Sequence, residues 1–185
     1  MKKIFIIDGA SGCGKTSVAL KLQEVYDNTH YIASSTIRPM RPEEVSGREH
    51  FFLSTEEFNE KQESGAFLGF YDMYFNKYGI EKEKVLVSKK DNIILTYHSE
   101  EGTLKNDIKN IGLEFTTILI LPDDEATLRD RIVRRNEKLE EHKIQARLDK
   151  YKEILAYKDK YDYVFMNKEG KLDELVSEIL GVINK

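Results

Sequence analysis

A glycine-rich run near the start of the chain has the spacing of a phosphate-binding loop. The run Gly9-Ala-Ser-Gly-Cys-Gly-Lys15-Thr16 matches G-x-x-x-x-G-K-[ST] in full. Glycines let the backbone curl until successive N–H groups point at phosphate oxygens, and a helix that begins there adds the positive end of its dipole. In such a loop the lysine bridges the β- and γ-phosphates, and the threonine hydroxyl holds Mg²⁺. The spacing predicts a nucleoside triphosphate site with Lys15 as a catalytic residue and Thr16 as the metal ligand.

The residues expected around the triphosphate are consecutive in the chain. They are Gly9, Ala10, Ser11, Gly12, Cys13, Gly14, Lys15, Thr16 and Ser17. Cys13 stands at a variable position of the motif, where we expect a small side chain that packs in the loop. The alternative is a redox-sensitive thiol, because a helix N-terminus lowers the pKa of a cysteine. As the single cysteine of the chain, it cannot form an internal disulfide, which fits a reducing compartment.

Two arginines three residues apart follow the second apolar run of the sequence. Arg38 and Arg41 lie in a polar stretch that begins at Ser34 and leads to the aromatic pair Phe51 and Phe52. Guanidinium groups offer fork-shaped pairs of donors that match phosphate oxygens. The alternative is a solvated loop. Beside a phosphate-binding loop, the pair is better explained as a clamp for the phosphate of a second, small acceptor molecule.

The elements that must position these groups alternate along the chain. Short apolar runs, typical of strands buried on both faces, are separated by stretches with helical period. This alternation predicts an α/β fold of three layers, with a central parallel sheet between helices. The predicted strands are Lys3–Asp8, Tyr31–Ser34, Asn92–Tyr97, Thr116–Leu121 and Tyr163–Met166, and the predicted helices are Lys15–Tyr26, Thr103–Ile111, Asp124–Arg135, Glu141–Tyr157 and Lys171–Ile183.

The alternation breaks between about Ser35 and Gly79. This stretch is rich in Phe, Tyr, Arg and Glu, and it indicates short strands with one helix at Thr55–Ser64. We interpret it as an insert that covers the substrate. No repeat or Gly/Ser-rich linker separates it from the rest, so a single domain is expected.

The bulk composition excludes several classes of protein. The chain has 185 residues, with 29 Lys and Arg against 33 Asp and Glu, and a formal net charge of −4. Acids and bases are mixed along the whole length, which argues against a nucleic-acid surface. No apolar run is long enough for a membrane span or a signal peptide. We therefore expect a cytoplasmic protein that binds neither nucleic acid nor membrane.

Several further runs resemble the guanylate kinase family. They are S-S-T-x-R-x-x-R-x-x-E-x-x-G from Ser34 to Gly47, F-L-S-x-x-E-F from Phe52 to Phe58, Asn76-Lys-Tyr78-Gly79, Arg131 with Arg135, Arg147-Leu148, and Tyr161–Asn167. With the phosphate-binding loop, the resemblance extends from Lys3 to about Leu180. A bare loop motif would not choose among the many families that have one. The combination is specific.

The resemblance implies an ATP-dependent kinase in three parts. These are a core of residues 1–34, 80–134 and 148–185, an acceptor-binding insert of residues 35–79, and a helical lid of residues 135–147. The reaction implied is phosphoryl transfer from Mg²⁺-bound ATP to a nucleoside monophosphate, GMP to GDP, by a monomer or homodimer. The implied catalytic residues are Lys15, Arg41, Arg131 and Arg147, with Arg131 and Arg135 also at ATP. The implied acceptor site consists of Ser35, Arg38, Arg41, His50, Gly69, Tyr78 and His98.

The departures from the family concern base recognition. The family usually has a glutamate at Gly69 and an acid at His98, which accept hydrogen bonds from guanine. A glycine offers no acceptor, and a neutral histidine offers at most one. These positions predict altered base recognition, for which Asp72 or Glu100 could compensate. The run Asn92–Tyr97 also ends without an Asp, so we expect Mg²⁺ to be held by Thr16, phosphate oxygens and water.

Two alternatives follow from these departures. His50, where the family usually has a tyrosine, and the run Tyr78-Gly79-Ile80 are similar to ribose 1,5-bisphosphate phosphokinases, whose acceptor has no base. The other alternative is a non-catalytic guanylate-kinase-like binding module. Such modules tend to lose loop or lid residues, whereas Lys15, Thr16 and the lid arginines are all present here.

Overall fold

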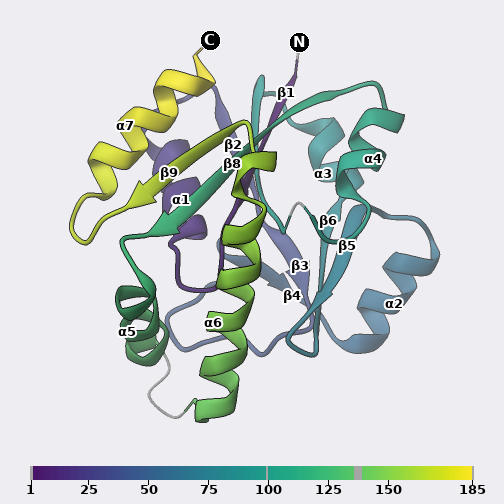
Figure 1. The fold of residues 1–185 in the computed structure, drawn as a ribbon. Coiled ribbons are helices and arrows are strands. Elements are labelled where there is room, and N and C mark those ends of the chain that lie inside the picture. Colours follow the sequence, from purple (N-terminus) through teal and green to yellow (C-terminus); the bar gives the residue numbers. More distant parts are fainter. Residues whose placement is uncertain (1, 99, 136–138, 185) are drawn as a thin grey trace.

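Five parallel strands form the central sheet of this computed structural model, which describes residues 2–98, 100–135 and 139–184. Their order across the sheet is β2-β7-β1-β8-β9 (Figure 1). The strands are β1 (Lys3–Asp8), β2 (Thr29–Ile32), β7 (Asn92–Thr96), β8 (Glu114–Pro122) and β9 (Tyr163–Asn167). Each neighbouring pair is parallel, as the alternation of strands and helices predicts.

The central strand β1 is buried on both faces because its successive side chains alternate between two hydrophobic clusters. Phe5 and Ile7 belong to one cluster, and Ile4 and Ile6 belong to the other. All residues from Ile4 to Asp8 are buried. The side chains of β1 therefore alternate between two faces, as in any strand, and the run is continuously apolar because both faces are buried.

Helices cover one face of the sheet and close the cluster that contains Phe5 and Ile7. They are α1 (Lys15–Val25), α5 (Glu125–Arg135), α6 (Glu141–Ala156) and α7 (Leu172–Ile183), with a short 3₁₀ turn at Lys158–Lys160. Leu22 of α1, Ile154 of α6 and Ile179 of α7 are fully buried there. In Figure 1, α1 and α7 lie beside β9, and α6 crosses the front of the view.

The other face is covered by a smaller sheet and three helices. The sheet has the order β4-β3-β6-β5 and is built from β3 (Ser34–Thr36), β4 (His50–Phe52), β5 (Phe67–Met73) and β6 (Asn76–Glu81). The helices of this part are α2 (Thr55–Glu63), α3 (Lys82–Val87) and α4 (Leu104–Asn110). Leu68 and Ile80 of the small sheet lie in the same cluster as Ile4 and Ile6 of β1. The insert therefore shares its core with the central sheet.

The three-layer α/β prediction is confirmed, and two local predictions need correction. The predicted strand Tyr31–Ser34 is two strands: β2 ends at Ile32, and Ser34 begins β3, which belongs to the other sheet. The apolar pattern is continuous across this point because both strands are buried, so it does not reveal the change of sheet. Helix α3 was not predicted. In the described part of the chain, no helix is both long and apolar enough to cross a membrane.

Candidate active site

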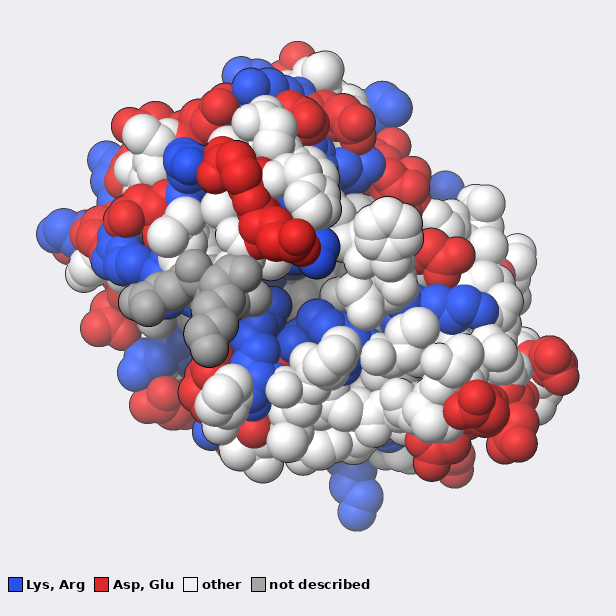
Figure 2. Space-filling model, turned by 90° about the horizontal axis from the view of Figure 1, so that it is seen from below, with Lys and Arg blue, Asp and Glu red and all other residues white. Residues whose placement is uncertain are grey.

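A cleft of about 520 Å³ opens at the carboxyl ends of β1 and β7. The phosphate-binding loop, the small sheet and side chains from α5 and α6 supply its walls. Figure 2 shows this side of the molecule, where Lys and Arg side chains gather in a hollow near the centre of the view. In open α/β sheets this edge is the usual place for a ligand.

The phosphate-binding loop connects β1 to α1 through three glycines with positive φ. Gly9, Gly12 and Gly14 have φ of 145°, 95° and 90°. A Cβ on Gly9 would come 2.4 Å from the carbonyl oxygen of Ile120, so the loop has no room for a side chain there. Asn167 at the end of β9 supports the loop by donating from Nδ2 to the Cys13 carbonyl, at 2.8 Å.

Six of the nine loop residues line the cleft. They are Ser11, Gly12, Gly14, Lys15, Thr16 and Ser17. The Lys15 ammonium donates to the carbonyl oxygens of Gly9 and Ala10, and burial lowers its pKa. Ala10 and Cys13 are fully buried beneath the loop. Burial raises the pKa of the Cys13 thiol to about 11, against the lowering effect of Lys15, so the alternative of an activated thiol is not supported.

A buried carboxylate lies directly under the loop. The Asp8 carboxylate accepts one hydrogen bond from the backbone N–H of Gly9 and one from the Tyr161 hydroxyl, each at 2.6 Å. Its Oδ1 also lies 3.1 Å from Nδ1 of His98. Burial alone would raise the pKa of Asp8, but the hydrogen bonds from His98 and Tyr161 and the charge of Lys15 hold it well below the usual range.

His98 lines the cleft with its ring fixed by Asp8. Burial lowers the pKa of His98, although the nearby Asp8 acts in the opposite direction. The ring is therefore neutral, and because ionised Asp8 can only accept, Nδ1 carries the hydrogen. Tyr71 packs edge-on against it, with ring centroids 5.4 Å apart. His98 can thus present one acceptor nitrogen, Nε2, to a ligand.

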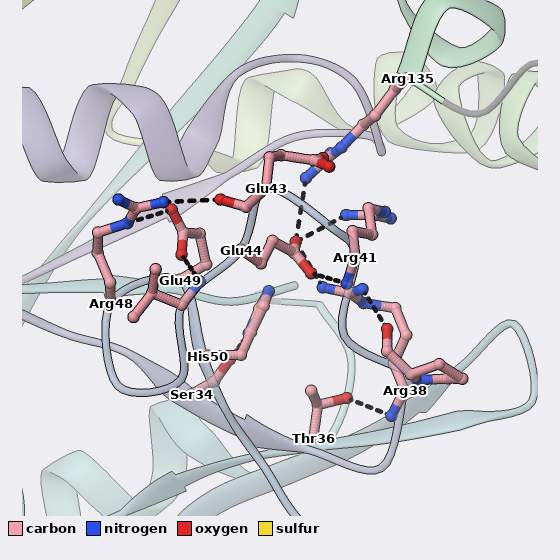
Figure 3. A network of polar contacts seen from close by, with 12 residues as sticks. Ser34, Thr36, Arg38, Arg41, Glu43, Glu44, Arg48, Glu49, His50 and Arg135 are labelled. Atoms are coloured by element: carbon pink, nitrogen blue, oxygen red, sulfur yellow. Dashed lines mark hydrogen bonds and ion pairs between the residues drawn. The ribbon is translucent and has the colours of Figure 1, made fainter.

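The acceptor arginines converge on a residue that the sequence reasoning did not select. Figure 3 shows Arg38, Arg41 and Arg135 around the carboxylate of Glu44, whose side chain is 2% exposed. Oε1 accepts from Arg38 Nη2 at 2.8 Å and from Arg41 Nη1 at 3.0 Å, and it lies 3.6 Å from Arg135 Nη2. Burial would raise the pKa of Glu44, but Arg38 and Arg41 lower it to about 2. The signal that could have identified Glu44 is its position three residues after Arg41.

Two polar residues of β3 and β4 complete this wall. Nδ1 of His50 lies 2.9 Å from the Ser34 hydroxyl, and its ring packs edge-on against Tyr78. Burial and the charge of Arg38 lower the pKa of His50 to about 4, so this ring is also neutral near pH 7. Ser34 lines the cleft, whereas the predicted Ser35 does not.

The placement of Ser35 follows from the pleat of β3. Successive side chains of a strand point to opposite faces, so Ser34 and Ser35 cannot both face the cleft. Ser35 is fully buried, and its hydroxyl donates to Oε1 of Glu81 at 2.8 Å. The structure therefore brings Ser34, and not the predicted Ser35, to the cleft.

Gly69 does not reach the cleft either. It lies in β5 against α4, where a Cβ would come 2.6 Å from the Cα of Leu104. The two acids expected to compensate are also elsewhere: Asp72 is exposed, and Glu100 forms ion pairs with Lys105 and Lys160. Among the described residues, no Asp or Glu from the small sheet lines the cleft. The acceptor wall is instead aromatic, with Tyr71 stacked on Tyr78 at 5.2 Å.

The donor-side arginines line the opposite wall. Arg131 donates to the Asn167 carbonyl at 2.9 Å and to Glu169 at 3.2 Å. Arg147 donates to the Lys143 carbonyl and lies 4.7 Å from the centre of the Tyr74 ring. Arg135, the third arginine predicted on this side, also lines the cleft. Residues 136–138 of the predicted lid lie outside the described part of the chain.

The loop between β9 and α7 also lines the cleft, and the sequence reasoning missed it. Its contributing residues are Asn167, Lys168, Glu169, Gly170 and Leu172. The signal was available, because this turn follows a predicted parallel strand, whose carboxyl end must face the same crevice as the phosphate-binding loop.

The predicted metal ligand, Thr16, lies in the cleft. No group of three His, Cys, Asp or Glu side chains suitable for a metal occurs among the described residues. Thr16 lines the cleft next to Lys15, and a hydroxyl is the kind of ligand that Mg²⁺ accepts when phosphates supply the remaining oxygens. The residues present therefore fit a Mg²⁺ ion that arrives with a nucleotide.

A phosphate-binding loop that faces two groups of arginines across one cleft defines a P-loop phosphotransferase. The chain matches the guanylate kinase family over residues 1–185. It therefore belongs to the guanylate kinase family.

Individual relatives agree with this assignment. The chain is 35% identical to a guanylate kinase of Caldanaerobacter subterraneus subsp. tengcongensis, over 97% of this chain and 85% of that protein. It is 33% identical to a guanylate kinase of Clostridium tetani, over 98% of this chain and 85% of that protein. The fold is also similar to the crystal structure of a guanylate kinase from Anaplasma phagocytophilum, with a TM-score of 0.75 at 23% identity, over 99% of this chain and 85% of that one.

Proposed function

We propose that this protein transfers the γ-phosphoryl group of ATP to the phosphate of GMP and releases ADP and GDP. The observation that carries the proposal is the single cleft in which Lys15 and Thr16 face Arg38 and Arg41. Relatives that share at least 30% of the sequence over nearly the whole chain are named guanylate kinases. A triphosphate at the loop and a monophosphate at the arginine pair would have their reacting groups in the same space.

The chemistry requires alignment and charge neutralisation rather than a base. An oxygen of the acceptor phosphate, already deprotonated near neutral pH, attacks the γ-phosphorus while the bond to the β–γ bridging oxygen breaks and ADP leaves with the electron pair. Lys15 would hold the β- and γ-phosphates, and Arg41, Arg131 and Arg147 would neutralise the charge that spreads over the moving group. Mg²⁺ bound at the Thr16 hydroxyl supplies further charge neutralisation. We also propose residues 135–147 as the lid that brings Arg135 and Arg147 to the triphosphate.

A second candidate is an acceptor without guanine, such as ribose 1,5-bisphosphate. The observation that favours it is the acceptor wall, where His98 offers one acceptor nitrogen, while Gly69 is packed against Leu104 and does not reach the cleft. Guanine presents an N1–H and a 2-amino group, and each donor left unpaired on burial costs about 1–3 kcal/mol. A sugar phosphate would use the same arginines without that cost.

The experiment that separates these candidates measures ADP release from Mg·ATP with a panel of acceptors. The panel consists of GMP, dGMP, IMP, AMP, UMP, CMP and ribose 1,5-bisphosphate. The proposal predicts the highest kcat/KM with GMP. A higher value with ribose 1,5-bisphosphate would support the second candidate. Absence of turnover with every acceptor, together with tight binding of a peptide or protein, would replace both by a binding module.

A further inference from the structure

One buried carboxylate is shared by three guanidinium groups in the cleft. Arg38, Arg41 and Arg135 all line the cleft, and all reach Oε1 of Glu44. Three like charges in so small a volume repel one another: burial and the charges of Arg135 and Arg38 lower the pKa of Arg41 to about 10. Glu44 offsets one of the three positive charges and leaves two, which matches the charge of a dianionic phosphate monoester.

The carboxylate is itself fixed by the backbone. Oε2 of Glu44 accepts from the Arg41 backbone N–H at 2.9 Å, and the Glu44 N–H donates to the Arg41 carbonyl at 3.1 Å. These two bonds close a turn, so the position of Oε1 follows from the backbone of the β3–β4 loop. Glu44 does not itself line the cleft. Its effect on a ligand therefore passes through the arginines that it holds.

The arginines come from two distant parts of the chain. Arg38 and Arg41 belong to the loop between β3 and β4, on the acceptor side, and Arg135 ends α5, on the donor side. We propose that Glu44 is a positioning residue that couples the two substrate sites, by holding the acceptor arginines and the donor-side Arg135 in one arrangement. The coupling rests on the function proposed above, in which one side takes GMP and the other takes ATP.

The coupling has a physical cause. The first ligand to bind orders the arginines around Glu44. The second ligand then binds without the loss of conformational entropy that this ordering requires. By linkage, ATP must then strengthen GMP binding by the same factor by which GMP strengthens ATP binding. A positioning role for Glu44 and a purely electrostatic role predict opposite changes in phosphate affinity when Glu44 is replaced. Removal of a negative charge beside an anion site should tighten phosphate binding, whereas loss of the arrangement should weaken it.

The test compares Glu44→Gln with Glu60→Gln. Glu60 is exposed on α2 and does not line the cleft, and its replacement by Gln changes the net charge by the same amount. GMP is titrated by calorimetry into each protein with and without Mg·AMP-PNP. We expect Glu44→Gln to weaken GMP binding about tenfold, which corresponds to the loss of one charge-assisted hydrogen bond. The factor by which Mg·AMP-PNP strengthens GMP binding, expected to be about fivefold or more, should fall close to one.

Glu60→Gln should keep both the GMP affinity and the coupling factor within about twofold of the wild type, because an exposed charge outside the cleft contributes little. Tighter or unchanged GMP binding by Glu44→Gln, with the coupling factor intact, would overturn the proposal. Wild-type protein that does not bind GMP counts against the proposed acceptor rather than against Glu44. In that case inorganic phosphate replaces GMP in the same titrations, and the affinity of each variant for phosphate decides the role of Glu44.

A second variant covers the case in which Glu44→Gln does not fold. The Arg135 side chain is 40% exposed, so Arg135→Gln should fold. It should lower the coupling factor as Glu44→Gln does, and the double variant should lower it no further than either single change. A coupling factor that Arg135→Gln leaves at the wild-type value would exclude the proposed link.

Discussion

The phosphate end and the acceptor wall of the same cleft are built from different kinds of group. At the phosphate end, glycines with positive φ fix the backbone, and arginines are held by a buried acid. The acceptor wall consists of stacked tyrosines and two neutral histidines, His50 and His98. The contrast predicts that phosphate transfer and choice of acceptor depend on separate residues, so that substitutions can change one function and leave the other intact.

The sharpest test of the phosphate end is Lys15→Ala. Without the ammonium, nothing else in the loop carries a positive charge to the β- and γ-phosphates, so kcat should fall at least about a thousandfold. Lys21→Ala, a change at a half-buried position of the same helix outside the cleft, is the matched control and should leave kcat unchanged. Steady-state ADP release measures both. Retained activity in Lys15→Ala would remove the loop from the catalytic assignment.

In β5, which also carries Tyr71 of the acceptor wall, Gly69→Ala tests whether a side chain can return to the position where the family usually has a glutamate. A Cβ there meets the Cα of Leu104 at 2.6 Å, so α4 must move. We expect the free energy of unfolding to fall by about 3 kcal/mol in urea titrations. Gly181→Ala in α7, where a Cβ meets nothing within 4 Å, should instead stabilise the protein by up to about 1 kcal/mol. Equal effects of the two changes would mean that Gly69 is not close-packed.

The neutral His50 predicts how stability depends on pH. Its pKa is lowered from 6.5 to about 4 on folding, so between these values the unfolded chain binds more protons than the folded one. Stability from this residue is therefore present above pH 6.5 and is lost as the pH falls towards 4, about 2 kcal/mol between pH 7 and pH 5. Urea titrations should show a smaller loss over this range for His50→Gln than for the wild type. The exposed His142, changed to Gln, should leave the wild-type loss unaltered.

The smallest expected effect concerns Cys13. Its raised pKa leaves about one thiolate in a thousand at pH 8, and the side chain is fully buried. Iodoacetamide at pH 8 should therefore label the native protein at a negligible rate and the urea-unfolded protein readily, as mass spectrometry would measure. Rapid labelling of the native protein would show that the floor of the phosphate end is open to solvent.

The sequence predicts the two ends of the cleft unequally, for physical reasons. A phosphate-binding loop is local, so its residues, its strand and its helix can be recognised from one run of sequence. Glu44 is a fixed position of the run from Ser34 to Gly47, but its role could not be predicted because Arg135 lies about ninety residues away and approaches only in the folded chain. Ser34 and Ser35 could not be told apart because the strand boundary at Ala33 sets which of them faces the cleft. Gly69 depends on the close approach of α4, which no local pattern encodes.

The position of β1 has a consequence for how the molecule opens. It is flanked by β7 and β8, and its last five residues are buried, whereas β4 is a three-residue strand at the edge of the small sheet. Amide hydrogens of β1 should therefore exchange with solvent only when the whole domain unfolds, and those of β4 during small local openings. The phosphate-binding loop, which follows β1, is thus expected to be attached to the slowest-exchanging part of the protein. The edge of the small sheet is expected to open at a far lower free energy than the central sheet.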